Sequence, residues 1–166
     1  MSIAGLLRQV MPAGVADDSV WRFVDALIWN WLIAGTDAHA KNYSLLLARD
    51  QVRLAPLYDI ASALPYGTHE MKLRFAIKIG GDYHVFPSRN TWSKAAQELN
   101  LDAQEVIDRV RTLAALAADA FADAAATPEI AALGRELPHR LTDLVAERAT
   151  RCARLVADKP DAGLAS

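Results

Sequence analysis

The chain has 166 residues, of which 52% are hydrophobic and 23% are charged, so one compact domain can bury its own core. A net charge of -2 gives no global electrostatic reason to expect nucleic acid or an anionic membrane as the main partner. The single cysteine, Cys152, excludes an internal disulfide framework, and the apolar stretches are shorter than the roughly 20 residues of a membrane span. We therefore expect a cytoplasmic protein.

The first predicted element is a buried helix. Asp17, Asp18 and Ser19 offer capping oxygens and a favourable negative charge at its start. Apolar residues then recur at helical spacing and cover more than one stripe, which predicts burial on most sides. These residues are Val20, Phe23, Val24, Leu27, Ile28 and Trp31. Gly35 is expected to end the helix because glycine turns left-handed readily.

Two β-hairpins are predicted after this helix. Residues 43–48 and 52–55 are short apolar runs separated by polar residues, the pattern of two strands and a turn. Residues 73–79 and 83–86 form a second such pair, with Gly80 as a turn candidate between them. The middle of the chain is therefore expected to contain small antiparallel sheets.

The rest of the chain is predicted to be helical. Ser88 is expected to cap a helix that ends near Leu99. Apolar positions within residues 107–121 define one face of a longer helix, which Pro128 should interrupt. A last helix is expected to begin near Pro138.

These elements predict a predominantly helical α+β fold. The expected order is a buried helix, a polar loop, a hairpin, a second polar loop, a second hairpin and a carboxyl-terminal helical bundle. Residues 1–157 are expected to form one domain, and residues 158–166 a flexible tail.

Reactive side chains are concentrated in the polar loop after the buried helix. Asp37, His39, Lys41 and Asn42 lie close together there, and core packing requires none of them. Asp59 follows the return strand of the first hairpin. Because a hairpin brings its two ends together, we expect Asp37, Asn42 and Asp59 to converge. Each residue alone is more typical of a turn or cap, so the catalytic interpretation depends on the set.

This order of oxygen-bearing side chains fits magnesium-dependent phosphoryl transfer. Magnesium takes one or two oxygen ligands from a protein, and Asn42 and Asp59 can supply them. A further carboxylate must orient or deprotonate the attacking hydroxyl, and Asp37 is the candidate. Kinase catalytic loops contain an Asp, an Asn five positions later and a metal-binding Asp after the next hairpin, which is the order found here.

Two segments resemble the catalytic signatures of HipA-family serine/threonine kinases. They are residues 36–44, Thr-Asp-Ala-His-Ala-Lys-Asn-Tyr-Ser, and residues 56–60, Pro-Leu-Tyr-Asp-Ile. The resemblance implies a protein-kinase-like carboxyl-terminal lobe with Asp37 as the catalytic residue and with Asn42 and Asp59 as magnesium ligands. It also implies that ATP lies beside residues of both segments: His39, Lys41, Asn42, Tyr58 and Asp59. The motif Asp-x-His-x-x-Asn is similar to that of lipid kinases as well, so the wider superfamily is implied independently of a substrate.

The resemblance also implies a biological setting. It is that of a toxin in a bacterial toxin-antitoxin pair, with a HipB-like DNA-binding antitoxin as partner and a protein as substrate. The chain departs from typical protein kinases because it has no His-Arg-Asp and because Ile60, rather than Phe-Gly, follows Asp59. Nothing ahead of Trp21 resembles a phosphate-covering loop or an ATP-pairing lysine. We therefore expect an amino-terminal lobe, from the same gene or another chain, to complete the enzyme, and expect this chain alone to be inactive.

Two other functions stay open. The chain can be a non-catalytic docking or regulatory module for an antitoxin or lobe partner. It can also be a metal-dependent hydrolase built on Asp37, His39 and Asp59, although that function explains Lys41 and Asn42 poorly.

Residues 69–94 are locally basic. A contact to operator DNA or to an acidic partner is the alternative there to an ordinary solvated edge. The basic side chains are Lys72, Arg74, Lys78, Arg89 and Lys94. We expect no metal-binding role for His69 and His84, which lack a metal-like spacing to His39.

Overall fold

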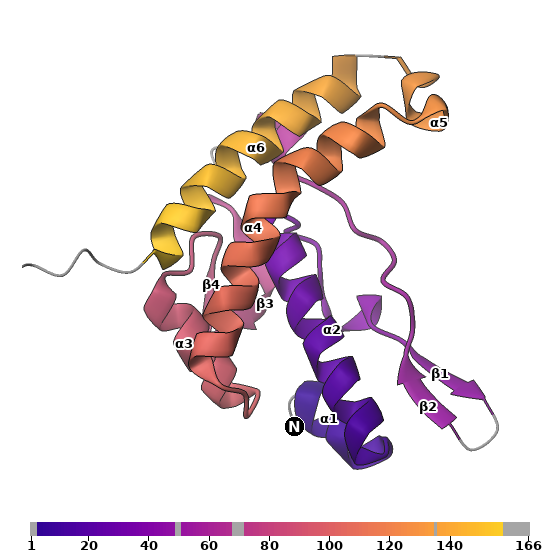
Figure 1. Ribbon diagram of the computed structural model, residues 1–166, viewed down its shortest axis with the longest axis vertical. Coiled ribbons are helices and arrows are strands. Elements are labelled where there is room, and N and C mark those ends of the chain that lie inside the picture. The colour runs from indigo at the N-terminus through magenta and orange to yellow at the C-terminus, as the bar shows by residue number, and fades with distance from the viewer. Residues whose placement is uncertain (1–2, 49–50, 68–71, 135, 158–166) are drawn as a thin grey trace, which may run out of the picture.

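The computed structural model describes residues 3–48, 51–67, 72–134 and 136–157 (Figure 1). The α-helices are α1 (Ile3–Val10), α2 (Ala13–Leu32), α3 (Arg89–Glu98), α4 (Ala103–Ala125), α5 (Pro128–Ala131) and α6 (Glu136–Val156). The strands are β1 (Leu45–Ala48), β2 (Gln51–Leu54), β3 (Arg74–Ile79) and β4 (Asp82–His84), and two short 3₁₀ helices are η1 (Ala40–Asn42) and η2 (Leu64–Tyr66). The predicted α+β fold, mostly helical with small antiparallel sheets, is confirmed.

The buried helix is α2, and it starts earlier than predicted. It begins at Ala13, directly after Pro12, and not at residues 17–19. Pro12 has φ -57, and its carbonyl accepts a hydrogen bond of 2.9 Å from the N–H of Ala16. The fixed φ of proline therefore sets the first turn, whereas Asp17 and Asp18 lie exposed one turn later. Helix α1, which packs against α2, was not predicted from the sequence.

Helix α2 forms the centre of the core. Val20, Val24, Ile28 and Leu32 are fully buried, which confirms the predicted burial on most sides. Trp31 packs edge-on against a tryptophan of α3, with ring centroids 5.3 Å apart. The helix therefore supports both the loop that follows it and the helices packed around it.

The two predicted hairpins are present as separate two-stranded antiparallel sheets. In the first, Leu45 lies opposite Leu54, and Gln51, expected in the turn, pairs with Ala48. In the second, an irregularity interrupts the pairing between β3 and β4, and β4 ends at His84 instead of continuing to residue 86. Residues 49 and 50, within the predicted first turn, lie outside the described residues.

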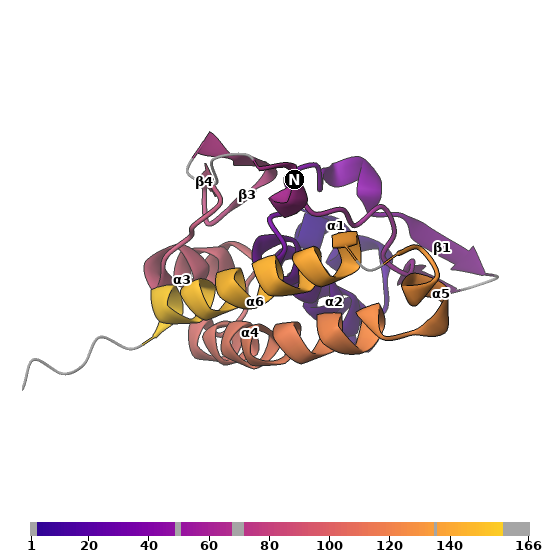
Figure 2. The same cartoon turned by 90° about the horizontal axis from the view of Figure 1, so that it is seen from above.

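The carboxyl-terminal helices lie as predicted. The Ser88 hydroxyl accepts a hydrogen bond of 3.3 Å from the N–H of Thr91, which confirms the cap of α3. Helices α4 and α6 pack side by side as a long hairpin with α5 at its tip (Figures 1 and 2). Pro128 opens α5, and α6 begins two residues before Pro138. The predicted tail, residues 158–166, lies outside the described residues, as does His69.

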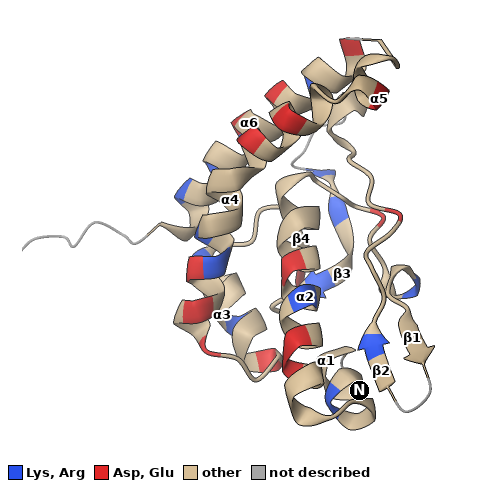
Figure 3. Cartoon of the chain, turned by 45° about the vertical axis from the view of Figure 1, so that its right-hand side comes forward, with Lys and Arg blue, Asp and Glu red and all other residues tan. Residues whose placement is uncertain are grey.

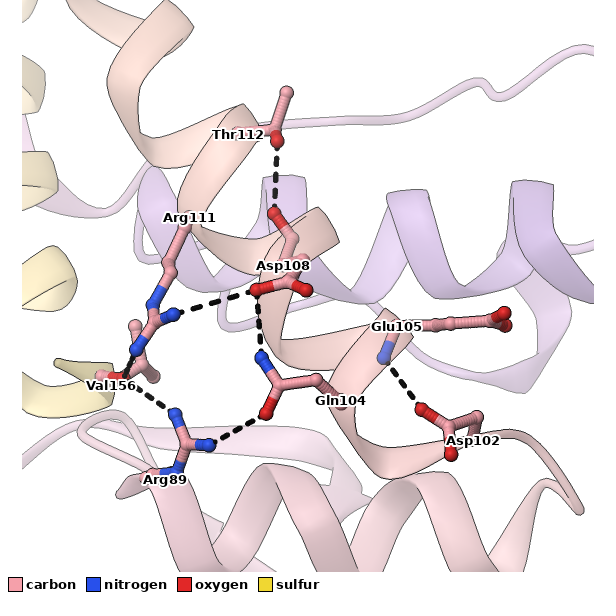
Figure 4. Close-up of polar contacts among 8 residues, drawn as sticks. All are labelled: Arg89, Asp102, Gln104, Glu105, Asp108, Arg111, Thr112 and Val156. Atoms are coloured by element: carbon pink, nitrogen blue, oxygen red, sulfur yellow. Dashed lines mark hydrogen bonds and ion pairs between the residues drawn. The ribbon is translucent and has the colours of Figure 1, made fainter. Parts of the chain in front are cut away.

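The end of α6 is held by polar side chains of α3 and α4 (Figure 4). The Val156 carbonyl accepts hydrogen bonds from Arg89 Nη1, at 3.4 Å, and from Arg111 Nη2, at 3.3 Å. Gln104 accepts a bond of 2.9 Å from Arg89 and donates one of 2.8 Å to Asp108. Positive groups at a helix carboxyl end are favourable, so this cluster fixes α6 against its neighbours. Arg89, counted above within the basic segment, is thus engaged with neighbouring helices.

None of the helices within the described ranges combines the length and the apolar character that a membrane crossing requires.

Two glycines in left-handed conformation allow a matched test of packing. Gly80 has φ +55, and a Cβ there would lie 2.1 Å from the Thr91 carbonyl oxygen. Gly67 has φ +66, and a Cβ there would meet no atom of the described residues within 4 Å. Gly67→Ala should lower the free energy of unfolding by about 1 kcal/mol, whereas Gly80→Ala adds a backbone clash and should lower it by about 3–5 kcal/mol. Urea unfolding followed by circular dichroism measures both, and equal losses would contradict the packing at Gly80.

Candidate functional site

The loop that carries the predicted site leaves α2 through a tight helix-ending turn. The N–H of Ala34 donates to the Trp31 carbonyl at 3.3 Å, and the N–H of Gly35 donates to the Asn30 carbonyl at 2.7 Å. With Ala34 at φ 52, these two bonds form a Schellman motif. The left-handed residue is therefore Ala34, and the left-handed role predicted for Gly35 is wrong. Gly35 is needed for close approach, because a Cβ there would lie 2.3 Å from Asn30 Oδ1.

Neighbouring segments hold the start of this loop. The Ser62 hydroxyl donates to the Ile33 carbonyl at 2.6 Å, and the N–H of Ala76, on β3, donates to the Thr36 carbonyl at 3.2 Å. The first of these bonds comes from the loop that follows β2. The two loops therefore constrain each other, and they run side by side with an acidic position on each (Figure 3).

Asn42 and Asp59 meet, as predicted for these two residues. Asn42 Nδ2 donates to Asp59 Oδ2 at 2.6 Å, and Asn42 Oδ1 accepts a bond of 3.0 Å from the N–H of His39. Asn42 is only 6% exposed, whereas Asp59 is exposed. Both ends of the carboxamide are thus engaged, and the carboxylate lies at the solvent side of the contact.

Asp59 has an unusual backbone conformation. Its φ is 56, in the left-handed region that residues other than glycine rarely enter. Holding an L-residue there costs about 1 kcal/mol, and strain of this kind concentrates at functional sites. No sequence signal predicted it.

Tyr58 contacts η1 and the segment that follows it. Its hydroxyl donates to the Lys41 carbonyl at 2.8 Å and lies 2.7 Å from the Ser44 hydroxyl. Tyr58 is 45% exposed, and the Lys41 residue is also exposed. Tyr58 and Lys41, both predicted to lie beside ATP, are therefore adjacent. The contact is made by the main chain of Lys41 and not by its side chain.

Asp37 and His39 are less closely tied to this cluster. Asp37 is exposed, and its carboxylate has no hydrogen bond or ion pair with any residue that the structure describes. His39 directly precedes η1, and its Nδ1 is buried without a hydrogen-bond partner in the described part of the chain. Asn42 and Asp59 thus converge as predicted. Asp37 lies on the same loop as Asn42, but its side chain bonds to neither residue in the described part of the chain.

A small cavity of about 10 Å³ lies against Asn30, Asn42, Tyr43 and Asp59. Tyr43 packs edge-on against Phe23, with ring centroids 5.0 Å apart. Its hydroxyl is buried without a partner among the described residues, and burial raises the pKa of Tyr43 to about 12. Asn30 and Tyr43 were missed as site residues because their sequence patterns are those of a helix core and a strand.

The oxygens present suit magnesium better than a metal held by several acids and imidazoles. The described residues contain no group of three or more His, Cys, Asp or Glu side chains that could hold a metal ion. Asn42 Oδ1 keeps a second lone pair, and one carboxylate oxygen of Asp59 is left by the contact with Asn42. Two such oxygens match the ligand number that magnesium takes from proteins.

The fold is that of the carboxyl-terminal lobe of a protein-kinase-like protein. It matches a HipA chain in the Shewanella oneidensis MR-1 toxin-antitoxin complex of HipA, HipB and operator DNA, with a TM-score of 0.65 and 18% identity over 80% of this chain and 31% of that one. The chain belongs to the family of HipA-like C-terminal domains, whose model matches residues 1–121.

A relative with a curated name is the "Putative kinase Y4mE" of Sinorhizobium fredii (strain NBRC 101917 / NGR234). It is 30% identical over 118 residues, which cover 70% of this chain and 27% of the relative. The chain therefore spans about a quarter of that protein's length. All of α5 and all of α6 lie beyond the part that the family model matches.

Tyr43 provides a test of the buried surroundings of the site. Tyr43→Phe removes a hydroxyl without a described partner and should not lower the free energy of unfolding at neutral pH. Because burial raises the pKa of Tyr43 from 10.0 to about 12, this group leaves the free energy of unfolding unchanged below pH 10. The free energy of unfolding then falls as the pH rises from 10 towards 12, since the hydroxyl ionises in the unfolded chain before it ionises in the folded one. The variant should lack this alkaline loss, as measured by urea unfolding across that range.

Tyr66→Phe is the matched control, since Tyr66 is 80% exposed. An alkaline loss that persists in Tyr43→Phe would show that Tyr43 is not the responsible group.

Proposed function

We propose that this chain is the catalytic, metal-holding lobe of a HipA-like serine/threonine protein kinase that transfers the γ-phosphate of ATP to a protein hydroxyl. The observation that carries the proposal is the 2.6 Å contact between Asn42 and Asp59. It joins two signature segments in the order that kinase catalytic loops use. Membership of the HipA-like family and the relative named as a kinase support it.

In this proposal Asn42 and Asp59 hold Mg²⁺. Bound magnesium would neutralise phosphate charge as the γ-phosphoryl group is transferred. The Asn42 amide fixes one oxygen of Asp59, and the His39 N–H fixes the Asn42 carboxamide. Both ligand side chains are therefore oriented before any ion binds, which limits the reorganisation that binding requires.

Asp37 is proposed to accept the proton of the attacking hydroxyl. Its carboxylate is exposed and has no partner among the described residues, so it is open to a substrate. The side chains of His39 and Lys41 are proposed to offset phosphate charge. Tyr58, which lies against the Lys41 main chain, is proposed to lie beside the nucleotide.

The remaining parts of the enzyme are proposed to come from outside this chain. An amino-terminal lobe would grip ATP, and this chain alone would be inactive. The similar Shewanella complex holds HipA, HipB and operator DNA, so we propose a toxin role in the cytoplasm with a HipB-like antitoxin as partner. Basic positions on β3, drawn blue in Figure 3, are the proposed place for any DNA contact.

Substitutions of the acidic residues test the chemistry in an enzyme assembled from this chain and an amino-terminal lobe. Asp37→Asn should lower the rate of phosphate transfer by at least about 100-fold, because it removes the proton acceptor. Magnesium affinity should stay unchanged, since Asp37 is not a proposed ligand. Asp123→Asn, an exposed position on α4, is the matched control and should leave transfer unchanged. Full activity in Asp37→Asn would exclude Asp37 as the base.

The metal site has its own readout, independent of turnover. Mn²⁺ substituted for magnesium should broaden the NMR signals of the Asn42 side-chain amide, and Asp59→Asn should weaken this effect at least tenfold in metal concentration. Broadening that is unchanged in Asp59→Asn would place the ion elsewhere. The alternative function, a non-catalytic docking module, would be excluded if this chain alone bound magnesium and ATP tightly and turned ATP over.

A further inference from the structure

Helix α6 carries an arginine that is completely buried. Arg148 is 0% exposed. Its Nε donates to the Trp31 carbonyl at 2.9 Å, and its Nη2 donates to the Val85 carbonyl at 2.7 Å. The guanidinium also lies over the Phe86 ring, 4.8 Å from its centroid. One side chain therefore joins α6 to the end of α2 and to the segment after β4.

The Trp31 carbonyl is also part of the turn that ends α2. The same oxygen accepts the 3.3 Å bond from Ala34 that helps to close the Schellman motif. A cation at the carboxyl end of a helix stabilises the negative end of the helix dipole, and burial strengthens this interaction. Arg148 thus acts on the turn from which residues 35–42 leave the helix.

We propose that Arg148 is a positioning residue for the loop of residues 35–42. It acts through the α2 turn and so sets where Asp37 lies relative to Asn42 and Asp59. The effect of Arg148 on the loop does not depend on the proposed function. The effect on catalysis rests on it, because only the proposed function makes this loop catalytic. It also assigns a role to α6, a helix outside the region matched by the family model.

The turn at the end of α2 is held both by the loop after β2 and by α6. Removing the contact from α6 alone therefore shows what that contact contributes. Ser62, in the loop after β2, bonds the Ile33 carbonyl at 2.6 Å, and Ala63 bonds the Ala34 carbonyl at 3.2 Å. Arg148 supplies the contact from α6. Without it, the turn keeps its contacts to the Asp59 loop but loses its attachment to α6, so the change should be local to the exit from α2.

Arg109, on α4, offers a control for Arg148 because it also ties a carboxyl-terminal helix to α2. Its guanidinium makes two bonds of 2.6 Å to Asp25, which joins α4 to α2 well before the exit turn. Replacing Arg109 also removes a cation and a tie between helices, but it leaves the Trp31 carbonyl untouched. The two arginines therefore separate a general loss of helix packing from a specific effect on the loop.

Hydrogen–deuterium exchange of the full chain tests the proposal with wild type, Arg148→Met, Arg148→Lys and Arg109→Met. Arg148→Met should raise exchange of the amides in residues 34–42 at least about tenfold while the amides of α4 keep their wild-type rates. Arg148→Lys keeps the cation and one donor and should give an intermediate increase. Arg109→Met should leave residues 34–42 at wild-type rates.

Two results would overturn the proposal. One is unchanged exchange in residues 34–42 of Arg148→Met, and the other is an even increase across α2, α4 and α6, which would mean general destabilisation. If Arg148→Met does not fold, Arg148→Lys against Arg109→Lys decides, because only the former should affect the loop. In the assembled kinase, Arg148→Lys should lower kcat at unchanged KM for ATP. Absence of phosphate transfer in the wild type would refute the proposed function but leave the exchange result standing.

Discussion

The hydrogen bond from Asn42 to the carboxylate of Asp59 joins the two loops on which the site depends. A bond to a charged acceptor is stronger than one between neutral groups, and here the donor is nearly buried, so leaving it unpaired would be costly. The bond is possible because β1 and β2 pair directly and return the chain to its starting point. The left-handed Asp59 then places its carboxylate against the amide at the cost of local strain.

The parts of this arrangement that depend on the local pattern of apolar and polar residues could be predicted from the sequence. Two apolar runs with a polar turn predicted the first hairpin, and the hairpin predicted that Asn42 and Asp59 meet. The predicted start of α2 was wrong because Asp17, Asp18 and Ser19 resemble the cap of a helix but lie one turn inside it. The fixed proline φ determined the first turn in the structure instead.

The features that the sequence did not reveal depend on contacts between distant segments. Gly35 reads as a left-handed helix stop, but its role is to make room for the side chain of Asn30 while Ala34 takes the left-handed conformation. In the sequence, Arg148 resembles any other charged position on an amphipathic helix. In the structure it is buried and bonds to the Trp31 carbonyl, 117 residues away in the sequence. No periodicity or spacing encodes such a pairing, because it arises only when α6 packs against the end of α2.

The distribution of constraint within the site fits phosphoryl transfer better than simple docking. The two proposed metal ligands are fixed, one of them by burial and by bonds at both ends of its carboxamide. Asp37, in contrast, is exposed and free of partners among the described residues. Metal ligands must hold a defined geometry, whereas a base must meet a hydroxyl brought by another molecule. A docking surface would need neither a strained aspartate nor a carboxamide bonded at both ends beneath it. The arrangement therefore favours the proposed phosphoryl transfer over a docking function.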